Sequence, residues 1–460
     1  MVHSNRMTLR TFREHSALKW LYPGMHIKRW LMLLLFGISL MGLGISYVLK
    51  EAYLQVEFPG TFYYLTLQFM PRWGRGLLFM ALSLTTVGIA ILKLNQSLLF
   101  AFVRPDNRDA EGRSPGLAQT IYNKRFLQRG PRVVAIGGGT GLSTLLRGLK
   151  GYTSNLTAIV TVADDGGSTG RLRQEFGVVA PGDLRQCIAA LAEAEPLMSK
   201  LFQYRFTEGT GLEGHSFGNL FIVAMAEVTG NFETALLEAS RVLNVRGRIL
   251  PSTLEDVTLS ARTHEDEMVH GEHNISERGA RIKDLYLNPS QAEAHPDAVR
   301  AVLEADLVVI GPGSLYTSVL PNLLVTGLQK ALFQTSATKV FICNVATQHG
   351  ETDNFSVADH IEAIERHTGK GILNAVLANS NLASELPEAW HSDPVPLSTE
   401  SLGAFEGVRL VLADVVAEEN RYRHDPEKLA ATLMRLYDNR DIPSTERPRS
   451  TPEAPLVATR

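Results

Sequence analysis

Residues 133–142 have the sequence Val133-Val134-Ala135-Ile136-Gly137-Gly138-Gly139-Thr140-Gly141-Leu142, and they decide the fold. The apolar residues predict a buried strand, and the glycines then allow a sharp turn without a Cβ clash. From Leu142 to Leu149 the apolar spacing becomes helical. A strand, a bare turn and a helix N-terminus together direct free N–H groups and a positive dipole end at one point, which favours phosphate binding. The alternative is a tight turn that binds nothing.

The glycine spacing departs from the standard nucleotide motifs. The G-x-G-x-x-G pattern needs a third glycine, but the count from Gly137 reaches Leu142 and the count from Gly139 reaches Thr144. The Gly-Lys-Ser/Thr of a P-loop is missing as well. We therefore predict a phosphate cradle of another class. Its residues are Gly137, Gly138, Gly139, Thr140 and Gly141.

Length and composition limit the class of protein. A chain of 460 residues with 45% hydrophobic residues can bury a large core and form more than one module. Its 45 basic and 48 acidic residues give a net charge of −3, which disfavours a nucleic-acid partner. Cys187 and Cys343 stand in apolar contexts, so we predict buried, reduced thiols, with a catalytic thiol as the alternative.

Two apolar stretches near the start predict a transmembrane hairpin. Residues 31–49 are uncharged and long enough to cross a bilayer, and residues 77–92 form a shorter second span between Arg75 and Lys93. Basic residues before the first span and after the second place both termini and the main domain in the cytoplasm, at the cell membrane. The predicted domains are a basic N-terminal segment (1–30), the hairpin (31–95), a linker (96–130), a ligand-binding domain (131–440) and a disordered tail (441–460).

A second small-residue loop follows the predicted strand 157–162. Asp164 and Asp165 carry carboxylates suited to ribose hydroxyls or to Mg²⁺, Gly166 permits close backbone approach, and Ser168 offers a hydroxyl to phosphate. The carboxyl ends of parallel strands lie at one edge of a sheet, so this loop should lie beside the glycine turn. The alternative is ordinary turn chemistry.

A third loop, with Gly311, Gly313, Ser314 and Tyr316, follows the buried strand 305–310. Its hydroxyls suit phosphate, and the tyrosine ring suits stacking on a ligand ring; a rigid Gly-Pro-Gly turn is the alternative.

Three further residues have two interpretations each. Asn219 can bind a base or a ribose through both halves of its amide. Asp183 either caps a helix or reaches the site, and Arg423 either clamps an anionic ligand or is an exposed arginine.

The stretch 248–283 alternates between polar and apolar residues, which predicts an antiparallel excursion. It carries His264, His270 and His273 among acidic residues, typical of a solvated hairpin turn, with a metal site as the alternative. The predicted fold class is therefore α/β. A mostly parallel, Rossmann-like sheet is flanked by helices, carries the small antiparallel excursion and follows the transmembrane hairpin.

Six motifs occur in an order that resembles the gluconeogenesis factor family (YvcK type). That family belongs to the superfamily that also holds the 2-phospho-L-lactate transferases (CofD type). The resemblance covers residues 130–440. The motifs occupy residues 135–142, 162–168, 181–183, 215–219, 311–318 and 344–348.

The resemblance implies binding of a nucleotide-linked metabolite. The YvcK branch implies a UDP-sugar such as UDP-N-acetylglucosamine, and the CofD branch implies GDP and a deazaflavin. The first hypothesis is a membrane-anchored regulatory protein that binds a UDP-sugar and links carbon metabolism to cell-wall synthesis and cell shape. It requires no cofactor, has cell-wall synthesis proteins as partners and leaves homo-oligomerisation open. The alternative is a Mg²⁺-dependent phospho-lactyl or phosphoryl transferase, with Asp164 and Asp165 as the metal ligands.

Overall fold

The computed structural model of the chain describes residues 27–55, 64, 67, 69–102, 127–193, 196–279, 281–382, 391–397 and 407–438. The chain divides into two compact units, Met1–Phe126 and Leu127–Arg460. The predicted basic segment up to residue 26, the linker from 103 to 126 and the tail 441–460 lie outside the described residues. Those parts of the domain division stay predictions.

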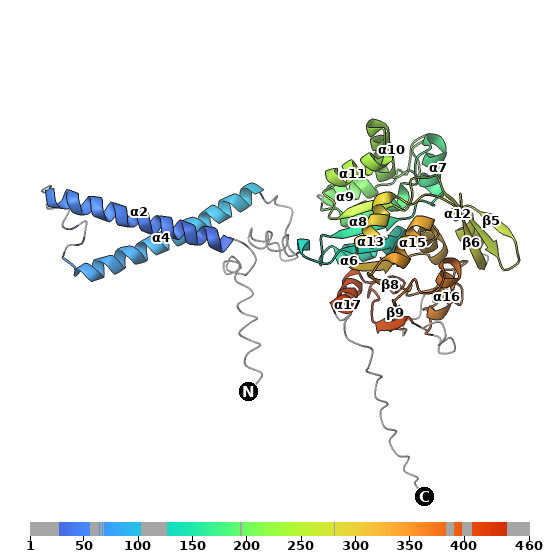
Figure 1. Ribbon diagram of the computed structural model, residues 1–460. Coiled ribbons are helices and arrows are strands. Elements are labelled where there is room, and N and C mark those ends of the chain that lie inside the picture. The colour runs from blue at the N-terminus through green and yellow to red at the C-terminus, as the bar shows by residue number, and fades with distance from the viewer. Residues whose placement is uncertain are drawn as a thin grey trace, which may run out of the picture. The chain divides into compact units, whose positions relative to one another are not determined.

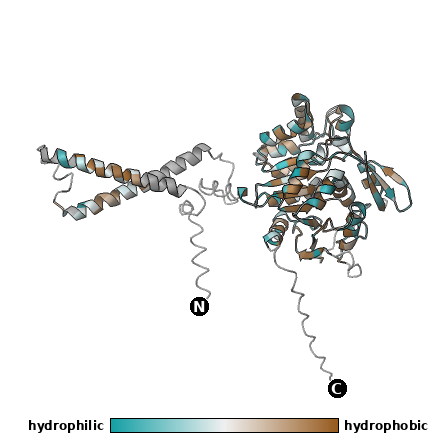
Figure 2. Ribbon diagram, in the orientation of Figure 1, coloured by the Kyte–Doolittle hydropathy of each residue, from teal (hydrophilic) through white to brown (hydrophobic). Residues whose placement is uncertain are grey.

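The first unit contains two long helices, α2 (Ile27–Gln55) and α4 (Arg72–Phe102) (Figure 1). The predicted transmembrane hairpin is wrong: within the residues that the structure describes, neither these helices nor any other combines the length and apolarity needed to cross a membrane. The prediction rested on the apolar stretches alone. Both helices extend beyond the predicted apolar stretches into charged residues: Lys50 and Glu51 follow the first stretch in α2, and Arg75 precedes the second in α4. Figure 2 shows hydrophilic as well as hydrophobic residues along the described parts of both helices. The predicted location at the cell membrane, as a protein with two spans, is wrong for the same reason.

The second unit is built on a sheet of seven strands in which every neighbouring pair is parallel. The strand order is β10-β9-β8-β7-β1-β2-β3. The predicted parallel α/β sheet is confirmed. Its strands are β1 (Val133–Gly137), β2 (Leu156–Val160), β3 (Arg248–Pro251), β7 (Leu307–Ile310), β8 (Thr338–Ile342), β9 (Ala375–Asn379) and β10 (Arg409–Ala413).

The strand order reverses between β1 and β7. From β1 the chain continues to β2 on one side, whereas β7 lies on the other side of β1 and continues to β8. The register sets Gly137 opposite Val160 and Ile136 opposite Ile310, so the turns after β1 and β7 begin at the same level. Ligands of open α/β sheets bind in the crevice at such a reversal. The fold therefore predicts a site between these two turns.

Every residue of β1, β7 and β9 is buried, which explains why these strands are apolar apart from Asn379 at the end of β9. Cys187 and Cys343 are both buried and free, as predicted, and burial raises the pKa of each thiol. The helices are α6 (Gly139–Leu149), α7 (Gly167–Phe176), α8 (Gly182–Leu191), α9 (Pro196–Gln203), α10 (Phe217–Thr229), α11 (Phe232–Val242), α12 (Glu272–Arg278), α13 (Pro296–Glu304), the π-helical turn η2 (Leu315–Val319), α14 (Leu320–Leu323), α15 (Thr326–Gln334), α16 (Val357–Thr368) and α17 (Pro426–Asp438).

The predicted antiparallel excursion is a separate three-stranded sheet of order β5-β4-β6, formed by β4 (Thr258–Thr263), β5 (Met268–His270) and β6 (Ile282–Asn288) (Figure 1). Buried and half-buried residues alternate along β4, as the sequence period requires. His270 bonds to Ser260 at 2.8 Å and His273 lies 3.4 Å from Glu277. Among the described residues, no three His, Cys, Asp or Glu side chains are grouped to hold a metal ion.

A candidate anion-binding site at the strand reversal

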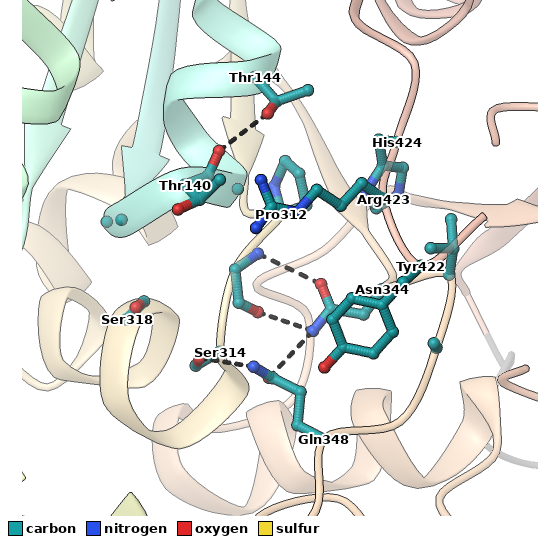
Figure 3. Close-up of a pocket in the computed structure, with 16 residues that line it drawn as sticks. Thr140, Thr144, Pro312, Ser314, Ser318, Asn344, Gln348, Tyr422, Arg423 and His424 are labelled. Carbon is teal, nitrogen blue, oxygen red and sulfur yellow. Dashed lines mark hydrogen bonds between the residues drawn. The ribbon is translucent and has the colours of Figure 1, made fainter. Parts of the chain in front are cut away.

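A pocket of about 270 Å³ lies at the ends of β1, β7 and β8, where the fold predicts it (Figure 3). Three segments far apart in the sequence supply it, together with the loop that precedes α17. The lining residues are Gly138, Gly139, Thr140, Gly141, Thr144, Pro312, Gly313, Ser314, Ser318, Asn344, Val345, Ala346, Gln348, Tyr422, Arg423 and His424.

The first wall is the glycine turn that opens α6. Gly139 has a φ of +59°, a conformation that side chains disfavour. Its N–H donates to the Asp183 carboxylate. Since the first N–H groups of a helix have no partner within it, those of Thr140 and Gly141 are left for a ligand. A Cβ at position 141 would lie 2.5 Å from the Pro312 carbonyl oxygen, so only glycine lets the two turns meet.

The second wall is the turn after β7, and Asn344 holds it in place. The Asn344 Oδ1 accepts the Gly313 N–H at 3.3 Å, and its Nδ2 donates to the Gly313 carbonyl at 2.9 Å. Gln348 donates to the Ser314 hydroxyl at 2.8 Å. The hydrogen bonds drawn in Figure 3 tie the two segments together. This wall is therefore fixed by amide side chains that follow the next strand, β8.

The third wall brings the only full charge among the described lining residues. Arg423 extends across the pocket toward Thr140 and Pro312 (Figure 3). His424 lies next to it, and its Nε2 is 3.2 Å from the Cys343 carbonyl oxygen, which can only accept. The ring therefore carries its proton on Nε2, and burial lowers its pKa to about 4. With a neutral histidine and no carboxylate among these residues, the pocket carries a positive charge.

The predicted carboxylates lie beside this pocket rather than in its lining. Asp165 accepts the N–H groups of Glu272 at 3.1 Å and His273 at 2.9 Å, at the start of α12. Asp164 accepts the Gly166 N–H at 3.0 Å. Of the two interpretations of Asp183, the helix cap is wrong, because Pro181 occupies the N-cap position of α8. The Asp183 carboxylate contacts the glycine turn instead.

These acids form a negative region beside the glycine turn. Removal from water and the charge of Asp164 raise the pKa of Asp183 to about 7. Burial is the main cause that raises the pKa of Glu272 to about 8, and the negative charges of Asp164 and other nearby carboxylates add to it. A carboxylate cluster of this kind holds protons near neutral pH.

Three more predicted site residues are buried outside the pocket. The amide of Asn219 accepts from Arg185 at 2.9 Å and donates to Ser168 at 3.1 Å. The Tyr316 ring is fully buried in the core, and its hydroxyl donates to the Ile282 carbonyl at 3.4 Å. Burial raises the pKa of Tyr316 to about 12.

Seven of the predicted residues meet at the pocket: Gly138, Gly139, Thr140, Gly141, Gly313, Ser314 and Arg423. Gly137 is the last residue of β1, and Gly311 is the first residue of the turn after β7. Both are next to residues of the lining in the sequence. The structure does not bring Asp164, Asp165, Gly166, Ser168, Asn219 and Tyr316 to the lining. The sequence reasoning missed Thr144, Ser318, Asn344, Gln348, Tyr422 and His424. For Asn344 and Gln348 the available signal was the segment 344–348, which follows a buried strand at the same sheet edge.

Comparisons with known proteins agree with this architecture. The family model described as "2-phospho-L-lactate transferase CofD" matches residues 133–416. A gluconeogenesis factor from Bacillus subtilis is 46% identical over 311 residues, 66% of this chain and 98% of that protein. A relative from Nostoc sp., whose name also refers to a gluconeogenesis factor, is 44% identical over 92% of this chain and 93% of its own length.

Solved structures give the same result. The crystal structure of a UPF0052-family protein from Bacillus halodurans is similar with a TM-score of 0.63 and 43% identity, and it covers 66% of this chain and 99% of its own. The match of the family model over more than half of the chain, and of a relative over nearly its full length, shows the family. The chain belongs to the gluconeogenesis factor (YvcK-like) family of the CofD superfamily.

Proposed function

We propose that the pocket binds the diphosphate of a UDP-sugar such as UDP-N-acetylglucosamine, and that the protein is a regulatory binding protein. One observation carries the proposal. A helix N-terminus, several hydroxyls and a single arginine converge at the strand reversal, with no carboxylate among the described lining residues. This combination attracts an anion with several oxygen acceptors, such as a diphosphate.

Each part of the pocket has a proposed role. The N–H groups of Thr140 and Gly141 bind one phosphate, and Arg423 binds across both. The hydroxyls of Ser314 and Ser318 serve the remaining oxygens. Tyr422 in the third wall offers an aromatic face to the base or the sugar, the role that the sequence suggested for Tyr316.

The volume is consistent with partial enclosure of this ligand. Pockets that enclose a whole drug-sized molecule measure roughly 300–1,000 Å³, and this one measures about 270 Å³. It fits the diphosphate and one adjoining ring, while the rest of the ligand extends into solvent. An exposed portion of this kind suits a protein whose bound state is recognised by others.

The relatives named gluconeogenesis factor support a role in carbon metabolism. We extend the proposal to a link between the supply of sugar nucleotides and cell-wall synthesis and cell shape. The partners proposed are proteins of cell-wall synthesis. No cofactor is required for binding.

The test is calorimetric titration of the full-length chain with UDP-N-acetylglucosamine. Arg423→Gln removes a charged donor, and such hydrogen bonds contribute about 1.5–3 kcal/mol, so affinity should fall by roughly 10- to 100-fold. The matched control is Arg300→Gln, which removes the same charge from an exposed side chain on α13. Absence of binding to the unmodified chain, or equal affinity in both variants, contradicts the proposal.

A transferase is the second candidate, favoured by the carboxylates of Asp164 and Asp183 beside the glycine turn and by the description of the family model. Phosphoryl-type transfer uses Mg²⁺ between carboxylates and phosphate oxygens. Incubation with a nucleotide-linked lactyl phosphate and Mg²⁺ tests it. Product formation that is lost in Asp164→Asn would support the transferase, and no product would leave binding alone.

A further inference from the structure

Three arginines gather on the second unit away from the pocket lining. Arg171 lies on α7, Arg185 on α8, and Arg205 follows α9. The helices that carry the first two both pack against α10 (Figure 1). Arg171 and Arg205 are exposed and Arg185 is half-buried, so solvent reaches the group.

Backbone contacts hold the guanidinium groups of Arg171 and Arg205 at neighbouring carbonyl groups. Arg171 donates to the Glu213 carbonyl at 2.8 Å, and Arg205 donates to the next carbonyl, that of Gly214. The side chain of Arg185 passes against Gly218, where a Cβ would lie 2.7 Å from its Cδ. Beyond its burial, the positive charge of Arg205 lowers the pKa of Arg185. Arg205 is thus close enough to repel Arg185, and it shares adjacent carbonyl partners with Arg171.

The three arginines differ from the other arginines of the described residues in their ion pairing. Within the described part of the chain, eight other arginines form ion pairs with carboxylates, but these three form none. The negative charges of Asp183 and Asp164 raise the pKa of Arg185 and offset part of the effect of Arg205, although neither carboxylate forms an ion pair with Arg185. Like charges held together without a partner cost free energy, which a bound anion would release.

A buried polar network fixes Arg185 in this position. Its Nε donates to Asn219 at 2.9 Å, and Asn219 in turn donates to the buried Ser168 hydroxyl at 3.1 Å. That oxygen also receives the Ser216 N–H at 3.4 Å, so its own proton points to His215 Nδ1, 3.1 Å away. The terminal nitrogens of Arg185 have no hydrogen-bond partner among the described residues. The network therefore orients the terminal nitrogens of Arg185 and leaves their N–H groups available to a ligand.

We propose that Arg171, Arg185 and Arg205 form a second anion-binding subsite, which takes a phosphate monoester of a small molecule. Three guanidinium groups supply more charge and more donors than one carboxylate needs, and their planar forks match phosphate oxygens. Ser168 and Asn219 are positioning residues for this subsite. None of its residues lines the first pocket, and it is independent of the UDP-sugar proposal.

Inorganic phosphate at low ionic strength is the probe, titrated calorimetrically into the full-length chain carrying Arg423→Gln, which removes the cation of the first pocket. Phosphate should still bind to this variant, at the subsite formed by Arg171, Arg185 and Arg205. Adding R171Q and R205Q should weaken it at least tenfold, whereas adding Arg300→Gln should not. Circular dichroism and the melting temperature verify that each variant is folded.

Lysine variants separate charge from structure. R171K and R205K keep the charges, so they should retain most of the phosphate affinity that the glutamine pair loses. Equal losses in both pairs, no difference between the glutamine pair and Arg300→Gln, or no phosphate binding once Arg423 is replaced would each overturn the proposal. A failure of UDP-N-acetylglucosamine to bind would leave these results unaffected, so the two proposals fail separately.

Discussion

Asn344 and Gly313 exchange two hydrogen bonds, one in each direction, although 31 residues separate them in the sequence. The side-chain amide pairs with the Gly313 backbone as a neighbouring strand would. It holds the turn after β7 against the segment after β8. Both halves of the amide are used, so the residue shapes the pocket wall more than it offers groups to a ligand. This relationship leads to the first prediction.

Asn344→Ala should weaken UDP-N-acetylglucosamine binding, because it frees the Gly313 turn. Net hydrogen bonds contribute about 0.5–1.5 kcal/mol each, so we expect a loss of stability of about 1–3 kcal/mol. Asn344→Asp loses the donor and also adds a negative charge beside the anion, so its affinity should fall further than that of the alanine variant. Chemical denaturation and calorimetry measure the two effects. An aspartate variant that binds as well as the alanine variant would refute an anionic ligand in this pocket.

Gly141→Ala tests the contact between the two turns. The added Cβ would lie 2.5 Å from the Pro312 carbonyl oxygen and 2.8 Å from the Gly313 Cα, both backbone atoms that cannot rotate away. Overpacking of this kind costs about 1–3 kcal/mol, and ligand affinity should fall with the displaced turn. Gly151→Ala is the control, since its nearest contact would be 3.4 Å. Equal unfolding midpoints for the two variants would show that the turns do not meet as described.

Glu351 predicts a pH dependence of stability. Its side chain is buried, one carboxylate oxygen accepts from Thr317 at 3.2 Å, and the other has no partner among the described residues. Burial raises its pKa from 4.5 to about 7. Between these values the folded chain keeps a proton that the unfolded chain has lost. The contribution of Glu351 to stability therefore decreases as pH rises from 4.5 to 7, by at most about 1.4 kcal/mol per pH unit.

Glu351→Gln removes this titration. The variant should be more stable than the unmodified chain at pH 8, and the difference should shrink toward pH 4.5. Urea denaturation at several pH values measures it, with the exposed Glu362→Gln as the control for loss of a surface charge. A difference that stays constant with pH would contradict a raised pKa at Glu351.

Competition distinguishes which part of the ligand the pocket holds. If the diphosphate is gripped by the glycine turn and Arg423, UDP should displace UDP-N-acetylglucosamine, whereas uridine, which lacks phosphate, should not. Fluorescence or calorimetric competition at fixed ionic strength measures this, because salt screens the charge contribution. Displacement by uridine at concentrations similar to UDP would place the recognition on the nucleoside.

The sequence predicted the centre of the fold well, because its signals are local. The apolar run before Gly137 and the glycines after it specify a strand and a turn, and parallel strands bring their carboxyl ends to one edge. Strand order is not local, so the sequence could not show that β7 lies beside β1 while β2 lies on the other side. It therefore could not separate the loop at Asp164 from the pocket.

Side-chain direction was the second limit. Tyr316 follows a glycine turn and suggested ring stacking, yet the π-helical turn η2 directs it into the core. Asn219 suggested base recognition, but Arg185 and Ser168 occupy its amide. Asn344 and Gln348 contribute through contacts with a turn more than 30 residues away. The segment 344–348 indicates a position at the sheet edge, but not these distant partners.

A crystal structure of the full-length chain with UDP-N-acetylglucosamine would show directly where the diphosphate binds. The account predicts the diphosphate at the N–H groups of Thr140 and Gly141, with the Arg423 guanidinium within hydrogen-bond distance of its oxygens. A diphosphate bound elsewhere on the second unit, or an Arg423 that does not contact it, would contradict the account.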